Sequence, residues 1–150
     1  MDPNTSILEK CHYLIFSPYR CNYDLGFGAL GSVTQNNVDG NQWLGPSNFA
    51  GTGILIVLVD DVDVSKNIIQ GNSDVGIFAF LVTDSTFDNN KVFDSGEDGP
   101  HGDFGIADVS GTDNSFTNNK VRGFDIAYFD VFGGKNKVIP GPQPGNAFFQ

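Results

Sequence analysis

The sequence predicts an all-β fold, a right-handed parallel β-helix (solenoid) of about four to five coils, because of its composition and an internal repeat. Its 150 residues include 19 Gly and 14 Phe, with many Asn and Asp but a single Met. Such a composition is typical of strands and tight turns rather than of helices. A hydrophobic content of 39% is enough for one core, so we expect a single domain over residues 1–150.

A short motif recurs along the chain, with Asp followed by an apolar residue at +3, Asn at +6 and an apolar residue at +8. The motif is complete at 61–69, 84–92 and 113–121, partial at 33–38 and degenerate at 130–138. A second element precedes it, namely Gly53-Ile54, Gly76-Ile77 and Gly105-Ile106, with Asp125-Ile126 as its last relative. Because two separate elements repeat together, we interpret the repeating unit as a whole coil.

The spacing of the repeated Asn residues is uneven, which favours coils with loops at their corners over a helical repeat. Equivalent residues of successive coils then stack in ladders. We expect Asn36, Asn67, Asn90, Asn119 and Asn136 to form a hydrogen-bonded ladder at a turn rather than to bind a ligand. Three apolar ladders are expected inside: Ile54, Ile77, Ile106 and Ile126; Val33, Val64, Phe87 and Phe116; and Val38, Ile69, Val92, Val121 and Val138.

The two ends of the chain are expected to cover the ends of the solenoid. We predict an N-terminal cap at 1–25, coils at 26–140 and a C-terminal tail at 141–150. Cys11 and Cys21 are compatible with one disulfide loop or with two reduced thiols. The prolines of the tail should prevent it from continuing a ladder, with Phe148 and Phe149 folding back over the last coil. An incomplete cap would instead allow self-association through the ends of the β-helix.

The charge of the chain argues against two classes of partner. Its net charge of −10 repels nucleic-acid phosphates and anionic lipid surfaces, so we expect neither nucleic acid nor membrane as a partner. No apolar run approaches the roughly 20 residues of a membrane helix, and residues 1–22 lack the pattern of a signal peptide.

From Leu30 to Pro140, the spacing apolar-x-x-Asn-x-apolar preceded by Gly-Ile resembles the pectate-lyase-like right-handed β-helix superfamily. It is similar in particular to NosD-like repeats and to carbohydrate-binding and sugar-hydrolase β-helices. The resemblance implies the fold, an extracellular or periplasmic location and an interaction with polysaccharide. Lyases of this kind use acidic residues for calcium with a Lys or Arg base, and polygalacturonases use an Asp pair with Gly-His-Gly; neither set is present in its usual arrangement here.

Two insertions at the same corner of the coil carry the candidate site, since loops on a rigid scaffold commonly bear function. One spans 42–51 and contains the only Trp, Trp43; the other spans 95–103. We predict substrate binding by Trp43, Asp74 and His101, where Asp74 belongs to the short turn of the intervening coil. Calcium ligands are predicted at Glu97, Asp98 and Asp103, and the candidate catalytic residues are Glu97, Asp98, His101 and Asp103.

Three interpretations of this corner remain open. In the first, Trp43 stacks on a sugar ring and the acidic loop binds hydroxyl groups or a bridging calcium ion. In the second, two loop carboxylates act as acid and base in a lyase or glycoside hydrolase. In the third there is no local site, and the insertions only pack over the solenoid. Asp61, Asp84 and Asp113 are expected to cap turns, with calcium binding along that ladder as the alternative.

Overall fold

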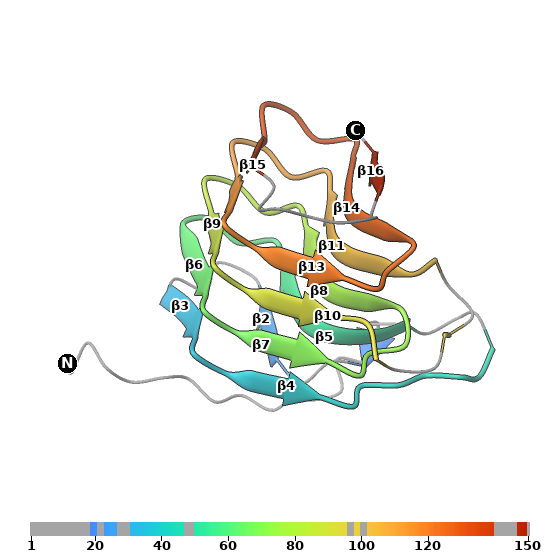
Figure 1. The fold of residues 1–150 in the computed structure, drawn as a ribbon. Helices are drawn as coiled ribbons and strands as arrows, with labels where there is room; N and C mark the ends of the chain where they lie inside the picture. Colours follow the sequence, from blue (N-terminus) through green and yellow to red (C-terminus); the bar gives the residue numbers. More distant parts are fainter. Residues whose placement is uncertain are drawn as a thin grey trace.

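The computed structural model describes residues 19–20, 23–26, 31–46, 50–95, 98–99, 102–139 and 147–149. Every regular element in this part of the chain is a β-strand, and all the pairings between strands are parallel (Figure 1). The strands form three sheets that run the length of a solenoid. No helix long and apolar enough to span a membrane occurs among the described residues.

The largest sheet has seven strands and contains the longest strands of the molecule. Its strands are β1 (Tyr19–Arg20), β2 (Tyr23–Gly26), β5 (Ala50–Val57), β8 (Val75–Phe80), β11 (Phe104–Val109), β14 (Ile126–Val131) and β16 (Ala147–Phe149). Both β1 and β2 pair with β5, and the others follow in the order β5-β8-β11-β14-β16.

The other two sheets consist of short strands. The five-stranded sheet contains β3 (Gly31–Thr34), β6 (Val62–Ser65), β9 (Thr86–Asp88), β12 (Ser115–Thr117) and β15 (Lys137–Ile139). The four-stranded sheet contains β4 (Asn37–Asp39), β7 (Ile68–Gln70), β10 (Lys91–Phe93) and β13 (Lys120–Arg122).

Successive strands of the chain pass once through each sheet and so form a coil (Figure 1). Three coils are complete within the described residues, β5-β6-β7, β8-β9-β10 and β11-β12-β13, and strands of incomplete or partly described coils flank them on both sides. The predicted all-β parallel solenoid is therefore confirmed, with about three full turns rather than four or five.

The predicted isoleucine ladder of the large sheet is correct for three of its four members. Ile54, Ile77 and Ile106 are paired in register and fully buried. Tyr128, not Ile126, stacks on Ile106, whereas Ile126 pairs with Phe104. The prediction for Ile126 was wrong because the last coil continues the Gly-Ile element with Ala127-Tyr128: a Cβ on Gly105 would lie 2.8 Å from the carbonyl oxygen of Ala127.

Of the two other apolar ladders, one is confirmed in full and the other at every member except its last. Val33, Val64, Phe87 and Phe116 stack in register in the five-stranded sheet. Val38, Ile69, Val92 and Val121 do so in the four-stranded sheet. Val138 was assigned to the wrong ladder, because it pairs with Phe116. In the degenerate copy at 130–138, Val138 therefore corresponds to Phe116 in the first half of the motif and not to Val121 in the second half.

The asparagine ladder forms as predicted over four coils. Asn67 donates through its backbone N and its Nδ2 to Oδ1 of Asn90, at 3.0 and 2.9 Å, and Asn90 repeats both bonds to Asn119 at 2.9 and 3.0 Å. Asn36 donates to Asn67 in the same way. Asn67, Asn90 and Asn119 are fully buried, so these amides satisfy backbone groups that water cannot reach.

Asn136 does not belong to that ladder, contrary to the prediction. Its Oδ1 accepts the backbone N–H of Asn114 at 3.0 Å, and Oδ1 of Asn114 accepts that of Ser85 at 3.0 Å. Ser85 in turn accepts the backbone N–H of Val62 at 3.1 Å. A second polar ladder therefore runs beside the five-stranded sheet.

Each complete coil turns three corners through a residue with positive φ. Two of the corners carry polar residues, one with Gln35, Lys66, Asn89 and Asn118 and one with Asp61, Asp84, Asp113 and Lys135. Asp and Asn tolerate this left-handed conformation better than most side chains. The predicted turn position of the three aspartates is therefore confirmed, and the conformation explains it without an ion.

Both ends of the sequence contribute strands to the large sheet. β1 lies inside the predicted N-terminal cap and β2 extends one residue beyond it, yet both pair with β5 as part of the solenoid. β16 lies inside the predicted tail and pairs in parallel with β14, so the expectation that the tail could not continue a ladder was wrong. Pro140 and the two prolines of the tail all precede β16 in the sequence, which leaves its backbone amides able to pair. Cys11 and Cys21 lie outside the described residues.

Candidate functional site

The two insertions meet at the turn that joins β7 to β8. Ser73 donates its backbone N–H to Asn41 O at 3.1 Å and accepts the backbone N–H of Trp43 on Oγ at 2.8 Å. From the other side, the backbone N–H of Gly99 donates to Ser73 O at 2.7 Å. Residues from both insertions thus contact one buried serine, so the structure brings them to the same corner of the solenoid.

Asp74 lies beneath this corner rather than on its surface. Its side chain is fully buried, and Oδ2 accepts the backbone N–H of Gly51 at 2.6 Å and the hydroxyl of Ser73 at 2.7 Å. Its carboxylate is also so close to Gly99 that a Cβ there would lie 2.4 Å from Oδ1. The geometry gives Asp74 a positioning role, holding both insertions in place, and leaves no surface through which it could touch a substrate.

Trp43 is half-buried in the first insertion. Its Nε1 donates to Pro46 O at 2.7 Å, and the ring lies against Gly45, where a Cβ would be 2.6 Å from the indole. The loop therefore closes on its own indole, which fixes the ring orientation. An oriented indole in a half-buried residue can provide an apolar platform for a ligand.

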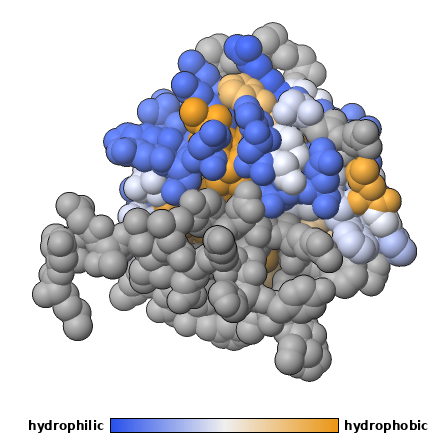
Figure 2. Space-filling model, turned by 90° about the horizontal axis from the view of Figure 1, so that it is seen from below, coloured by the Kyte–Doolittle hydropathy of each residue, from blue (hydrophilic) through white to orange (hydrophobic). Residues whose placement is uncertain are grey.

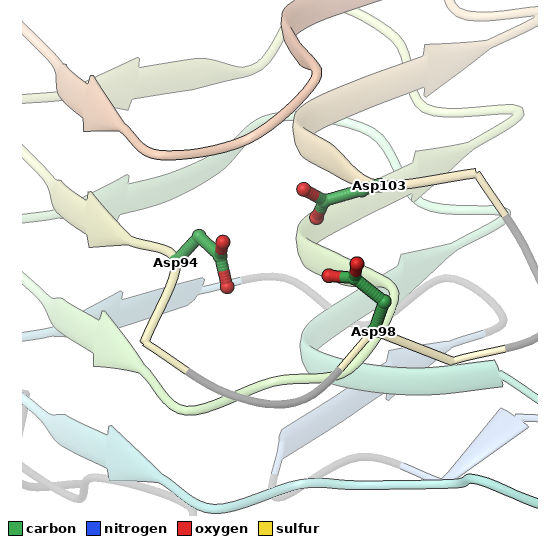
Figure 3. A group of neighbouring side chains, drawn as sticks. All are labelled: Asp94, Asp98 and Asp103. Atoms are coloured by element: carbon green, nitrogen blue, oxygen red, sulfur yellow. The ribbon is translucent and has the colours of Figure 1, made fainter.

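Three carboxylates converge at the second insertion, two from the insertion itself and one from the residue that precedes it. Asp94 follows β10, Asp98 lies in the loop and Asp103 precedes β11, and their side chains turn toward a common space (Figure 3). One oxygen from each lies within 4.8 Å of the others. No other group of three potential ligands this close occurs in the described part of the chain, the aspartates of the corner ladder included. We call Asp94, Asp98 and Asp103 the aspartate triad.

The electrostatics of the triad disfavour three negative charges. Burial, together with the charges of Asp94, Asp98 and Asp125, raises the pKa of Asp103 to about 7 against the lowering effect of the Asp125 backbone N–H. That N–H donates to Asp103 Oδ2 at 3.1 Å. Near neutral pH Asp103 therefore takes up a proton readily, and a cation bound between the carboxylates would relieve the same repulsion.

Residues 8–138 match the family model described as a right-handed β-helix region. The chain belongs to the right-handed β-helix family. No curated protein and no solved structure matches it significantly. Family membership accounts for the fold, and the chemistry of this β-helix must be argued from its own residues.

The structure brings only some of the predicted site residues together. Asp98 and Asp103 come together as expected, whereas Glu97 and His101 lie outside the described residues. Asp94 was missed by sequence reasoning. A signal for it exists: Asp94 occupies the corner that Gly40 occupies in the first coil, since each donates its backbone N–H to the last residue of the next coil's strand, Arg122 and Gln70 respectively. An aspartate where the scaffold elsewhere uses glycine indicates a role beyond the turn.

A second pair of carboxylates lies inside the β-helix, at its C-terminal end. Asp108 and Asp130 are paired in register, and Nδ2 of Asn136 donates to both, at 3.0 and 3.1 Å. Asn114 donates a further bond to Asp108 at 3.0 Å. Burial raises the pKa of Asp108 to about 6. Because amides of the second polar ladder enclose this pair, we assign it a structural role.

Proposed function

We propose that this β-helix binds glycans at the corner formed by its two insertions, with a divalent cation at the aspartate triad. The observation that carries the proposal is the convergence of both insertions on Ser73, which sets an oriented indole and a cluster of carboxylates on one corner. Sugars are commonly recognised by an aromatic ring against the apolar face and by oxygen groups or a bound ion at the hydroxyls.

The triad supports the cation part of the proposal through its dimensions. Two oxygen ligands on opposite sides of a calcium ion are about 4.8 Å apart, twice a typical Ca–O distance. The triad oxygens lie within 4.8 Å of one another, so three of them fit around one ion. An ion with few protein ligands retains open positions for water or glycan hydroxyl groups.

Calcium binding should depend on pH, because Asp103 must lose its proton to act as a ligand. Its pKa of about 7 means that affinity should rise from pH 5.5 toward pH 8, with calcium displacing the proton. We expect a Kd no tighter than about 10⁻⁴ M, since the glycine-rich loop loses entropy on closing. Isothermal titration calorimetry at several pH values measures both quantities.

A matched pair of variants tests where the ion binds. Asp98→Asn should weaken calcium binding, whereas Asp113→Asn removes the same charge at an exposed corner with positive φ, where Asn is well tolerated. Absence of calcium-dependent heat, or equal heats in wild type and Asp98→Asn, would exclude the triad as the cation site.

Trp43→Ala should weaken glycan binding more than removal of any one triad carboxylate. The ring covers a sugar face with little loss of entropy, whereas a carboxylate mostly exchanges its hydrogen bonds with water. The measurement is affinity for neutral and acidic glycans, with and without calcium. Leu44→Ala, at a 53% exposed residue of the same loop, is the control and should bind as wild type does.

The opposite result is equally well defined. If Trp43 serves only to hold its loop on the β-helix, Trp43→Ala should destabilise the fold by about 3 kcal/mol or more and leave glycan binding unchanged. In that case the native indole should also resist quenching by acrylamide. Such a result would contradict the proposed platform.

A glycoside hydrolase or lyase is the second candidate, favoured by the raised pKa of Asp103. A carboxyl that holds its proton near pH 7, beside a carboxylate such as Asp98, can act as a general acid. Analysis of the same glycans for shortened products distinguishes the candidates. Product formation that Asp103→Asn abolishes while binding persists would establish catalysis; intact glycans would leave binding as the function.

A further inference from the structure

Two carboxylates lie on the inner side of the large sheet at its C-terminal end. The inward row that begins with Ile56 and Ala79 continues in register with Asp108 of β11 and Asp130 of β14. The described surface seen from below is mainly hydrophilic, as expected where polar side chains point outward (Figure 2). Asp108 and Asp130 instead point into the interior, and we call them the interior pair.

One side-chain amide brings the two carboxylates of the interior pair together. Nδ2 of Asn136 donates to Oδ2 of Asp108 at 3.0 Å and to Oδ2 of Asp130 at 3.1 Å. Their strands are also paired, and paired strands lie about 4.8 Å apart. Two carboxylates this close repel each other when both are ionised, and the repulsion is strongest where water is excluded.

No cation offsets this repulsion in the described part of the chain, where neither carboxylate of the interior pair forms an ion pair. Tyr128 is the other titratable residue on the inner side of β14, and burial raises its pKa to about 12, so it stays neutral near pH 7. β8, on the other side of β11, contains no titratable residue. The charged residues of β10, β13 and β15, and those that precede Asn114 and Asn136, are exposed: Lys91, Asp113, Lys120, Arg122, Lys135 and Lys137.

Burial distinguishes the two members of the interior pair. Asp108 is 2% exposed and Asp130 is half-exposed, so a negative charge costs more on Asp108. Burial, together with the charge of Asp130, raises the pKa of Asp108 to about 6 against the lowering effect of the hydrogen bonds from Asn114 and Asn136. Asp108 is therefore the member that holds a proton.

We propose that the interior pair is a pH-sensitive lock on the C-terminal end of the β-helix. In mildly acidic solution one proton, on Asp108, leaves a single negative charge in the pair, and the amides of Asn114 and Asn136 hold the side chains together. Loss of this proton places two adjacent charges in the interior. The strands that can separate in response are the last ones, β14 with β16 paired to it, and β15, which begins directly after Asn136.

The direction of the pH effect follows from the affinity of Asp108 for its proton. The pKa of Asp108 is raised from 3.8 to about 6 in the folded chain, so the folded chain binds this proton more tightly than the unfolded chain does. The stabilising contribution of the proton is fully present below about pH 4 and is lost as the pH rises through about 6. Titration of Asp108 should therefore raise the equilibrium constant for unfolding by up to about 100-fold between pH 4 and pH 7.

Carbon-13 NMR of the Asp side-chain carboxyl groups in the full chain, from about pH 3 to pH 8, observes the proton directly. The Asp108 signal should titrate with a midpoint near pH 6, and the Asp130 signal should shift at the same step because the two groups interact. In Asp130→Asn the midpoint of Asp108 should fall, since the neighbouring charge is gone. A midpoint near pH 4 in the wild type, or an unchanged midpoint in Asp130→Asn, would overturn the proposal.

Urea unfolding at about pH 4.5 and pH 7.5 tests the effect on stability. Asp108→Asn replaces the proton-bearing carboxyl by a neutral amide of the same shape, so its unfolding equilibrium constant should change at least tenfold less between the two pH values than that of the wild type. The pH dependence that Asp103 contributes is common to both proteins and cancels in this comparison. Asp113→Asn, at an exposed carboxylate, is the control and should keep the pH dependence of the wild type.

Hydrogen exchange locates the effect along the β-helix. After correction for the intrinsic exchange rates, the backbone amides of β14 and β15 should lose protection in the wild type between about pH 4.5 and pH 7.5, and those of β5 and β8 should not. The same loss in all coils, or an equal loss in Asp108→Asn, would contradict a lock at the C-terminal end. Should Asp108→Asn lose its strand spectrum, the NMR titrations of the wild type and of Asp130→Asn decide the question.

Discussion

Asn90→Ala should destabilise the β-helix by about 3 kcal/mol or more. The Asn90 side chain is fully buried, donating to Val64 O at 2.8 Å and Asn119 Oδ1 at 3.0 Å and accepting two bonds from Asn67. Alanine would remove the donor to Val64 O and the acceptor shared by the backbone N–H and one Nδ2 hydrogen of Asn67, all in the interior. Urea unfolding monitored by circular dichroism measures the change in the free energy of unfolding.

The control for this variant is Asn37→Ala, at an exposed asparagine of β4. Surface substitutions of this kind change stability by about 0.5 kcal/mol or less. Equal effects of the two substitutions would mean that the asparagine ladder does not stabilise the coils. An Asn90→Ala variant that unfolds at lower urea with an unchanged slope would show that the native and unfolded states keep their compactness.

The fold could be predicted from sequence because every coil of a solenoid has nearly the same structure, so the same residue types recur in each coil. Each coil aligns with the next, so an apolar or Asn position that recurs three or four times identifies its ladder directly. The prediction failed for Asn136 and Val138 in the last coil. The motif contains two similar halves, and the single degenerate copy at 130–138 was aligned with the wrong half. Asn114-Ser-Phe116 and Asn119-Lys-Val121 share the pattern Asn-x-apolar, and Asn136-Lys-Val138 fits either half. Local pattern therefore could not decide the register that pairing with Phe116 settles.

The candidate site was predictable in its location and less so in its members. Insertions relative to a compact coil mark the corner from sequence alone, and both do contact Ser73. The burial of individual side chains could not be predicted from the sequence. Asp74 and Asp98 both lie in glycine-containing turns, yet Asp74 is fully buried and Asp98 is exposed. Asp94 precedes the compared loop in the sequence, and only the path of the chain brings it to within 4.8 Å of Asp103.

Phe87→Ala should destabilise the protein by about 3 to 5 kcal/mol, the range for a large buried aromatic. Phe87 is fully buried, and its ring stacks on that of Phe116 at a centroid distance of 4.6 Å. Alanine removes the ring and leaves a cavity between Val64 and Phe116, which the strands cannot close because their spacing is set by backbone pairing. Phe93→Ala, at a half-buried Phe on an outer face, should cost less than about 2 kcal/mol.

Contact between the rings of Phe87 and Phe116 contributes stabilising energy beyond that expected from their buried apolar area. A double-mutant cycle that combines Phe87→Ala with Phe116→Ala measures this coupling energy. The coupling energy should be about 0.5 to 1.5 kcal/mol, because the ring contact is lost once whichever partner is removed first. Both free energies come from urea unfolding of the four proteins. Coupling near zero would mean that Phe87 and Phe116 fill the interior independently. The stability of successive coils would then rest on backbone pairing and the asparagine ladder rather than on contact between stacked side chains.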